Sequence, residues 1–137
     1  MRNWRLSAWV AFAVLALVPQ AKAACLVPGA TPMVILTFYF GENIPGAPLL
    51  TPAQWDDFAA KVITPVFPDG LTVTDGQGQW MDPRTKAISH DPTKILTVAV
   101  MDSPVLAAKI GKVIAAYKTA YHQQSVGIIT EDACAKF

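Results

Sequence analysis

The sequence predicts an α+β domain in which a four-stranded antiparallel sheet carries two helices on one face. Four segments rich in β-branched and aromatic residues indicate strands, and two segments with apolar residues at helical spacing indicate amphipathic helices. The expected strands cover residues 33–40, 71–80, 94–101 and 125–130, and a helix follows the first and the third of them. The order β-α-β-β-α-β is that of the ferredoxin-like fold, with right-handed crossovers and the spatial strand order 4-1-3-2.

The first 23 residues have the pattern of a cleaved signal peptide. Arg2 and Arg5 precede an apolar run over residues 6–18, and a small-x-small cleavage site ends at Ala23. This run is shorter than the roughly 20 apolar residues that a spanning helix needs, which favours a cleaved signal over an uncleaved membrane anchor. We therefore expect one domain over residues 24–137, periplasmic or secreted, with no membrane span after the signal is removed.

The charge balance argues against a nucleic-acid partner. The chain has 11 Lys and Arg residues and 10 Asp and Glu residues, and the signal removes Arg2, Arg5 and Lys22. The remaining domain then has 8 basic and 10 acidic side chains, a net charge of −2. A mildly acidic chain without a Lys/Arg cluster is a poor binder of phosphate backbones.

Two cysteines remain after cleavage, Cys25 and Cys134. In an exported chain such a pair suggests one disulfide, and the predicted topology brings both residues to the same end of the sheet. Lipidation of Cys25 is the alternative that would anchor the protein to the envelope. Lys22 speaks against it, because the lipoprotein peptidase expects an aliphatic residue there. Two free thiols are the third reading.

Local signals fix the expected ends of the helices. Thr51 is a predicted N-cap, with Gln54 completing a capping box, and Pro65 is expected to end this first helix. The second helix is expected to begin after Ser103 and to carry Tyr117 and Tyr121 on its core-facing side.

The second and third strands are expected to form a hairpin, and Asp91-Pro92 is expected to interrupt strand structure before the third strand begins. Matching the apolar residues of the two strands fixes the register. The expected cross-strand pairs are Leu71–Val98, Val73–Leu96, Asp75–Lys94 and Gln79–His90. Gly76 and Gly78 predict a bend or bulge in the strand, which could change the distal pairs.

The face of the sheet turned away from the helices is expected to be half apolar. It carries Ile35, Thr37, Tyr39, Ile95, Thr97 and Ala99. A face of this kind usually meets a ligand, a long loop or a second subunit, so a homodimer through it is one expectation. Tyr39, at the end of its strand, is the candidate contact.

The segment Asp75–Trp80 raises the question of a phosphate-binding loop. No helix can begin after Gly78, so the segment lacks the helix N-terminus that would hold phosphate. Asp75, Gln77, Gln79, Trp80 and Lys94 are candidates to bind a small polar ligand. Each also has a purely structural reading: an ion pair for Asp75 and Lys94, solvated glutamines, and an aromatic side chain that covers the sheet edge.

The sequence contains no catalytic or metal-binding motif. His90 and His122 are the only histidines and lie in unrelated segments, so no metal-ligand spacing is present. The serines lack the glycine-flanked turn of a nucleophile. We therefore expect no metal and no cofactor, and assign no catalytic residue.

Several motifs resemble a bacterial family of small exported proteins of unknown function. They occupy residues 39–41, 51–58, 62–80, 93–96, 115–118 and 123–126, and the run over 62–80 is the most specific. The resemblance implies a small exported α+β domain and carries over no activity. Many members look like lipoproteins, from which Lys22 departs.

Two functions fit these observations. The first is a non-enzymatic binding or interaction module that uses the open sheet face. The second is a small cofactor-free enzyme, similar to the α+β monooxygenases and isomerases, with a cavity on that face. The second rests on analogy of fold alone.

Overall fold

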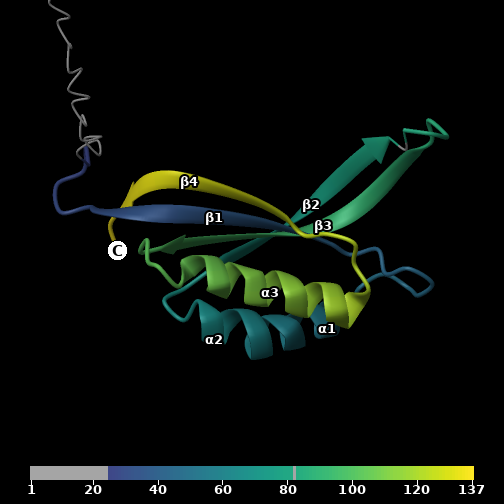
Figure 1. Cartoon of the computed structure of the whole chain (residues 1–137), viewed down its shortest axis with the longest axis horizontal. Helices are drawn as coiled ribbons and strands as arrows, with labels where there is room; N and C mark the ends of the chain where they lie inside the picture. Colours follow the sequence, from purple (N-terminus) through teal and green to yellow (C-terminus); the bar gives the residue numbers. More distant parts are fainter. Residues whose placement is uncertain (1–24, 82) are drawn as a thin grey trace, which may run out of the picture.

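A computed structural model describes residues 25–81 and 83–137 of the chain, so the expected signal peptide lies outside the described residues. The protein has two layers, with a sheet on one side and helices on the other (Figure 1). The strands are β1 (Thr31–Gly41), β2 (Thr72–Met81), β3 (Ile88–Val100) and β4 (Gly127–Ala135). The helical segments are α1 (Pro52–Phe58), η1 (Ala59–Ile63), α2 (Thr64–Val66) and α3 (Leu106–Tyr121).

The sheet is antiparallel throughout, with the strand order β2-β3-β1-β4. Read from the other edge this is 4-1-3-2, and it leaves β1 and β3 in the centre. The continuous helical run α1–η1–α2 and helix α3 cover one face, and the opposite face has no helix over it among the described residues (Figure 1). The predicted α+β class and the four-stranded antiparallel sheet are therefore confirmed.

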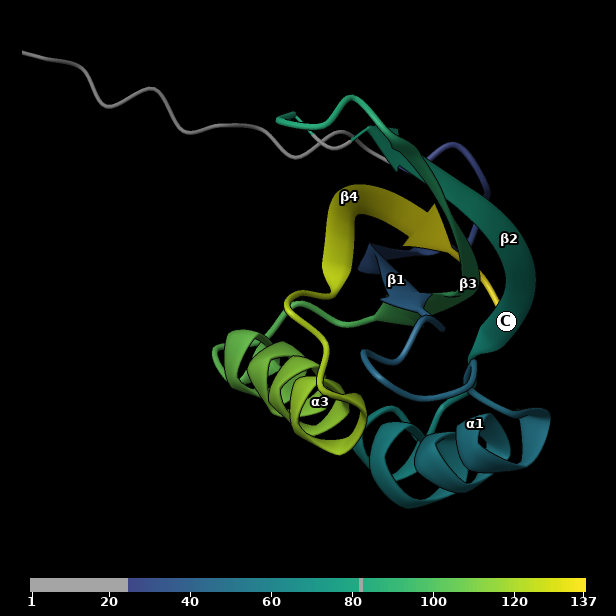
Figure 2. The ribbon, with the colours of Figure 1, turned by 90° about the vertical axis from the view of Figure 1, so that its right-hand side faces the viewer.

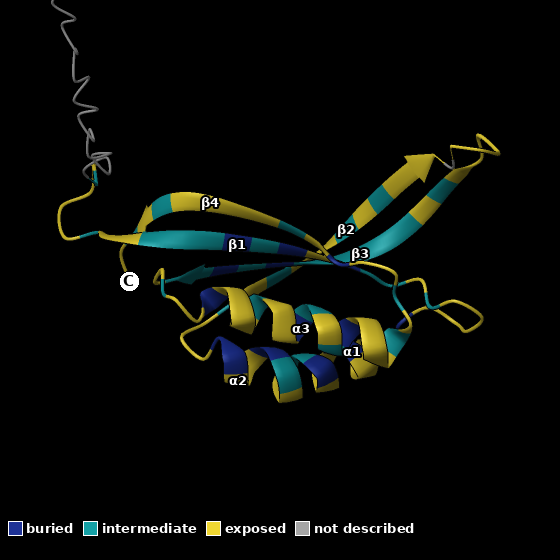
Figure 3. Ribbon diagram, in the orientation of Figure 1, coloured by how far each residue is buried: buried dark blue, intermediate teal, exposed yellow. Residues whose placement is uncertain are grey.

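Alternation along the central strands separates a buried face from an open one. Leu36, Phe38 and Phe40 of β1 are fully buried, and Val98 and Leu96 of β3 lie opposite the first two of them. Figure 3 shows buried stretches on β1 and on the helices that cover this face. Burial of each such side chain stabilises the fold by about 1.5–3 kcal/mol. No polar residue is buried in the core that the described residues form.

The first helical segment runs past the proline that was expected to end it. Thr51 forms the predicted capping box with Gln54, but helical structure continues through Pro65 to Val66. The backbone N–H of Thr64 donates to the carbonyl of Ala59, five residues back, so the turn before Pro65 is a π-turn. A proline cannot donate the usual bond and clashes with the preceding turn of an α-helix. The wider turn accommodates it, because the hydrogen bonds shift by one residue there.

Three other element boundaries differ from expectation. The expected break at Asp91-Pro92 is absent, and β3 continues through it. Glu42 N–H donates to the Pro92 carbonyl at 2.8 Å, so the edge of Pro92 that lacks an N–H faces the chain leaving β1. In an antiparallel strand the N–H and C=O of one residue point to the same side, so Pro92 removes no bond between β2 and β3.

Helix α3, the second of the two predicted helices, begins later than predicted, and strand β4 is longer than predicted. Ser103 accepts from Leu106 N–H through its carbonyl, so residues 103–105 form a turn before α3. Strand β4 extends to Ala135 because β1 begins at Thr31, and β4 pairs with β1 along the whole length of β4. Cys134 therefore lies within the sheet rather than in a tail.

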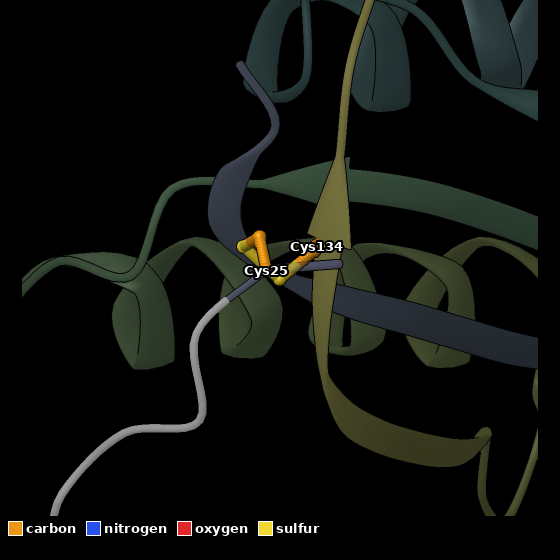
Figure 4. Close-up of a disulfide and its surroundings, with 2 residues drawn as sticks. All are labelled: Cys25 and Cys134. Carbon is orange, nitrogen blue, oxygen red and sulfur yellow. A yellow bond between two sulfur atoms is a disulfide. The ribbon is translucent and has the colours of Figure 1, made fainter. Parts of the chain in front are cut away.

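The predicted disulfide between Cys25 and Cys134 is present (Figure 4). It joins the segment before β1 to the end of β4 and closes a separation of 109 residues. Because both cysteines are paired, no free cysteine occurs in the part of the chain that the structure describes. Within the same residues no helix is long and apolar enough to cross a membrane.

Removal of the disulfide is expected to destabilise the domain strongly. In the loop-entropy model a link of this length contributes on the order of 5 kcal/mol. Urea unfolding of a Cys25→Ser/Cys134→Ser variant should show that loss in the free energy of unfolding. Wild-type protein in dithiothreitol is the control and should show the same loss. Equal stability with and without the link would contradict this role.

The hydroxyl of Tyr117 is expected to matter more than that of Tyr121. Tyr117 is fully buried and donates to the carbonyl of Gly41 at 2.8 Å, and burial raises its pKa. Tyr117→Phe leaves that carbonyl without its donor and should cost about 1–2 kcal/mol of unfolding free energy. Tyr121 donates to the exposed Gln54 carbonyl at 3.0 Å, so Tyr121→Phe is the matched control and should cost less. Urea unfolding that ranks the two variants in the opposite order would contradict the assignment.

Candidate functional site

The register of the hairpin divides the six predicted ligand-binding residues between two faces. The expected pairs Val73–Leu96, Asp75–Lys94 and Gln79–His90 are present, whereas Leu71 precedes β2 and its expected pair with Val98 is not part of the ladder. The ladder runs from Thr72 to Met81 without a bulge. Residues paired directly across two strands lie on the same face. Lys94 is opposite the buried Phe40, so it lies on the helix-covered face.

Asp75, Gln77 and Gln79 alternate with Gly76, Gly78 and Trp80 along β2. Asp75, opposite Lys94, therefore lies on the helix side of the sheet, together with Gln77 and Gln79. Tyr39 and Trp80 lie on the open face. The structure does not bring the six residues together into one site.

Asp75 and Lys94 form an ion pair on the helix side of the sheet. The Lys94 ammonium donates to the Asp75 carboxylate and lies 3.7 Å from that of Glu42. The side chains of Lys94 and Glu42 are 16% and 13% exposed, whereas that of Asp75 is 78% exposed. The hydrogen bond to Asp75 is the main cause of a raised Lys94 pKa, opposed in part by burial. The ammonium of this cluster is shared between two carboxylates, so Lys94 is fully engaged and the cluster has a net charge of −1.

A pocket of about 620 Å³ lies on the open face. It spans the end of β1, the distal half of the β2–β3 hairpin and the loop that precedes β4. Its wall contains two aromatic rings, Tyr39 and Trp80, and one carboxylate, Asp91. Hydroxyl and amide side chains supply most of the rest: Asn43, Ser89, Thr93, Gln123, Gln124 and Ser125.

Curvature of the sheet forms the pocket. Figure 2 shows β4 and the β2–β3 hairpin curving away from the helices on either side of β1. The open face is therefore concave where these elements meet. Trp80 and Tyr39 stand on this face with 54% and 36% of their surface exposed.

Glycines keep the floor of the pocket free of side chains. Gly41 and Gly127 line it directly, and Gly76 and Gly78 lie next to it on β2. A Cβ at Gly41 would lie 2.6 Å from the Asp91 carboxylate, and one at Gly78 would lie 3.0 Å from the Asp91 carbonyl. The glycines of the 75–80 segment therefore permit close packing on the open face. They do not interrupt the ladder.

Hydrogen bonds between side chains and the backbone hold Asp91 at the pocket wall. Its carboxylate accepts from the N–H of Asn43 at 3.3 Å, and its carbonyl accepts from the Thr93 hydroxyl at 2.9 Å. The Asn43 side chain donates to the His90 carbonyl at 3.2 Å, and Gln123 donates to the Asn43 carbonyl. These contacts tie the loop after β1 to both β3 and the segment before β4.

The pocket contains residues that the sequence did not single out, above all Asp91, Asn43 and Gly127. A signal for Asp91 was present. Counting back in twos from Ile95 through Thr93 places Asp91 and Ser89 on the open face, provided that the strand continues through Pro92. Asn43 and Gln123 come from loops and had no pattern to reveal them. No group of His, Cys, Asp and Glu side chains that could hold a metal occurs in residues 25–81 and 83–137.

Loss of the Asp75 charge is expected to have a small, pH-dependent effect on stability. Asp75→Asn should cost about 0.5 kcal/mol at neutral pH, because Asp75 is exposed and screened by salt. Since the Lys94 pKa is raised in the folded state, this contribution is present below pH about 10.4 and is lost as pH rises through the folded pKa.

The measurement is urea unfolding of both proteins from pH 7 to 11 at low salt. The difference in unfolding free energy should shrink at the alkaline end. A difference that grows with pH, or none at low salt, would contradict the pair.

Comparison with solved structures finds a similar fold in a phage SAM lyase. Its complex with S-methyl-5'-thioadenosine has a TM-score of 0.59 and 12% identity, covering 73% of this chain and 81% of that chain. Its apo state has a TM-score of 0.56 and 12% identity, covering 82% and 87%. At this identity the likeness concerns the fold alone.

No curated protein matches the chain. A family model described as "Protein of unknown function (DUF3574)" matches residues 36–137, which is most of the chain and all of the sheet except the start of β1. The chain therefore belongs to the DUF3574 family of proteins of unknown function.

Proposed function

We propose that the protein is an exported, non-enzymatic binding module that holds a small organic ligand in the open-face pocket. The observation that carries the proposal is the pocket itself, with two aromatic rings, a carboxylate and a glycine floor, on a sheet face that no helix of the described residues covers. Ligand sites commonly have volumes of about 300–1,000 Å³ and combine apolar walls with a few polar groups. The volume of about 620 Å³ lies in that range, and the two aromatic rings supply apolar surface in a lining that is otherwise mostly hydroxyl, amide and carboxylate side chains.

The glycines support a binding role over a purely structural one. A glycine inside a strand costs roughly 0.5–1 kcal/mol relative to alanine, because it loses more conformational freedom on folding. Gly41, Gly76, Gly78 and Gly127 all belong to strands, and none of them has a positive φ. Gly41 and Gly127 line the pocket itself, where a side chain would reduce the space for a ligand. Gly76 and Gly78 lie beside it on β2, where a Cβ would press on Ile95 or Asp91.

Export and fold class complete the proposal. The Cys25–Cys134 disulfide is consistent with an oxidising compartment. Together with the N-terminal sequence pattern, it supports a periplasmic or secreted protein rather than a lipid-anchored one. The element order and the strand order β2-β3-β1-β4 support assignment to the ferredoxin-like class.

A second copy of the chain is the alternative occupant of the open face. Beyond the pocket this face carries Ile35, Ile95 and Ile129, and Ile129 is exposed. Sedimentation distinguishes the two occupants, because a small ligand leaves the mass of the protein unchanged whereas a homodimer doubles it.

A small-molecule enzyme is the second candidate function. The fold likeness to a phage SAM lyase, solved with S-methyl-5'-thioadenosine bound, favours it over other chemistries. Incubation with S-adenosylmethionine and chromatography of the products would test it. Release of S-methyl-5'-thioadenosine at a rate above the protein-free control would support a lyase, and an unchanged substrate would count against it.

The binding proposal predicts that Trp80 contributes to affinity and that its neighbour Met81 does not. The two residues are adjacent on β2 and 54% and 56% exposed, but they point to opposite faces. Stacking on an aromatic ring contributes about 1–3 kcal/mol per ligand ring. Trp80→Ala should therefore weaken binding by roughly 5- to 150-fold, and Met81→Ala should leave it unchanged.

The measurement is isothermal titration calorimetry with S-adenosylmethionine, S-methyl-5'-thioadenosine and a panel of amines, alcohols and carboxylates. Equal affinities of the two variants would place the ligand elsewhere. The absence of any saturable binding across the panel would reject the proposal.

A further inference from the structure

We propose that the ligand of the open-face pocket is a small organic cation, and that Asp91 is the residue that pairs with its positive charge. The inference rests on the proposed binding function and adds the charge of the ligand. Three features carry it: the position of the Asp91 carboxylate, the absence of a paired cation among the described residues, and the rings that flank it.

The Asp91 carboxylate is presented to the pocket with little competition from neighbouring side chains. Asp91 lies opposite Gly78 on β2, so no side chain stands beside it on that strand. On the other side its Oδ2 lies against the backbone of Gly41, where a Cβ would come within 2.6 Å. The hydrogen bond from Asn43 N–H, at 3.3 Å, occupies Oδ1.

Within residues 25–81 and 83–137, no positive side chain is paired with this carboxylate. The residues that line the pocket include no lysine, arginine or histidine. Among the ion pairs of the described residues none involves Asp91. Lys94, three residues along β3, lies on the opposite face and is held by Asp75 and Glu42. A carboxylate in a partly enclosed site without a partner attracts a cation, because the low-dielectric walls focus its field.

The aromatic rings favour an organic cation over a metal ion. Trp80 lies opposite Ser89, one alternation along β3 from Asp91, or about 7 Å along the strand. Tyr39 stands on the other side, opposite Ile95. A cationic group held by Asp91 would therefore have an aromatic residue on either side of it in the strand direction. Aromatic faces attract ammonium-type groups in addition to stacking on flat ones.

The test compares ligands that differ in charge and little else. Benzylamine, benzyl alcohol and benzoate form one set, and choline with its neutral isostere 3,3-dimethylbutan-1-ol forms the second. Isothermal titration calorimetry on the mature chain should find each cation bound at least tenfold more tightly than its neutral partner, and benzoate the weakest of its set. Added salt should reduce the preference.

Variants assign that preference to Asp91. Asp91→Asn preserves the shape of the side chain and should remove the preference for cations while leaving the affinity for benzyl alcohol within about twofold. Gly41→Ala keeps the carboxylate but forces it to move, and should also reduce the preference. Asp132→Asn, which removes an exposed carboxylate from β4, is the matched control and should change nothing. Circular dichroism confirms that each variant is folded.

The outcomes separate this inference from the proposed function. Neutral members that bind as tightly as the cations, or a cation preference that survives Asp91→Asn, would overturn the inference and leave the binding function intact. If no member of either set binds at millimolar concentration, both are rejected.

Discussion

The contact between Phe40 and Tyr117 links the core of the protein to its pocket. The two rings meet edge to face with centroids 4.7 Å apart, and the Tyr117 hydroxyl donates to the carbonyl of the next residue of β1, Gly41. This fixes the depth of α3 against the sheet and the point at which β1 ends. Because Gly41 is also part of the pocket floor, the same contact that packs the core determines where the floor lies.

Alternation along the strands lets one segment serve both layers. Successive residues of β1 belong in turn to the core and to the open face, as Phe40 and Tyr39 show. On β2 the same alternation assigns Asp75 to the ion pair with Lys94 and Trp80 to the pocket. The two faces of the hairpin therefore have different roles, although their residues are mixed in the sequence.

Much of the fold followed from the sequence because apolar side chains fix it. The register of β2 against β3 is determined by Val73 and Leu96, since a shift of one residue would expose both. The pocket was harder to predict. Pro92 predicts the end of a strand, so Asp91 was not expected to lie within one. The structure tolerates Pro92 because the side of this residue that lacks an N–H faces Glu42, where β1 has already ended. Asn43 and Gln123 enter from loops, whose paths depend on tertiary contacts that no local pattern encodes.

The disulfide has a consequence for how the domain can be presented to its surroundings. It lies where β1 begins and β4 ends, whereas the pocket lies where β1 ends and β4 begins. The length of β1, 11 residues or about 35 Å, separates the two. The N-terminal end of the described chain therefore lies at the opposite end of β1 from the pocket, so this end of the chain does not crowd the ligand site. The covalent link makes this geometry resistant to a pull on the N-terminus, because force would pass into the sheet through Cys134 as well as through β1.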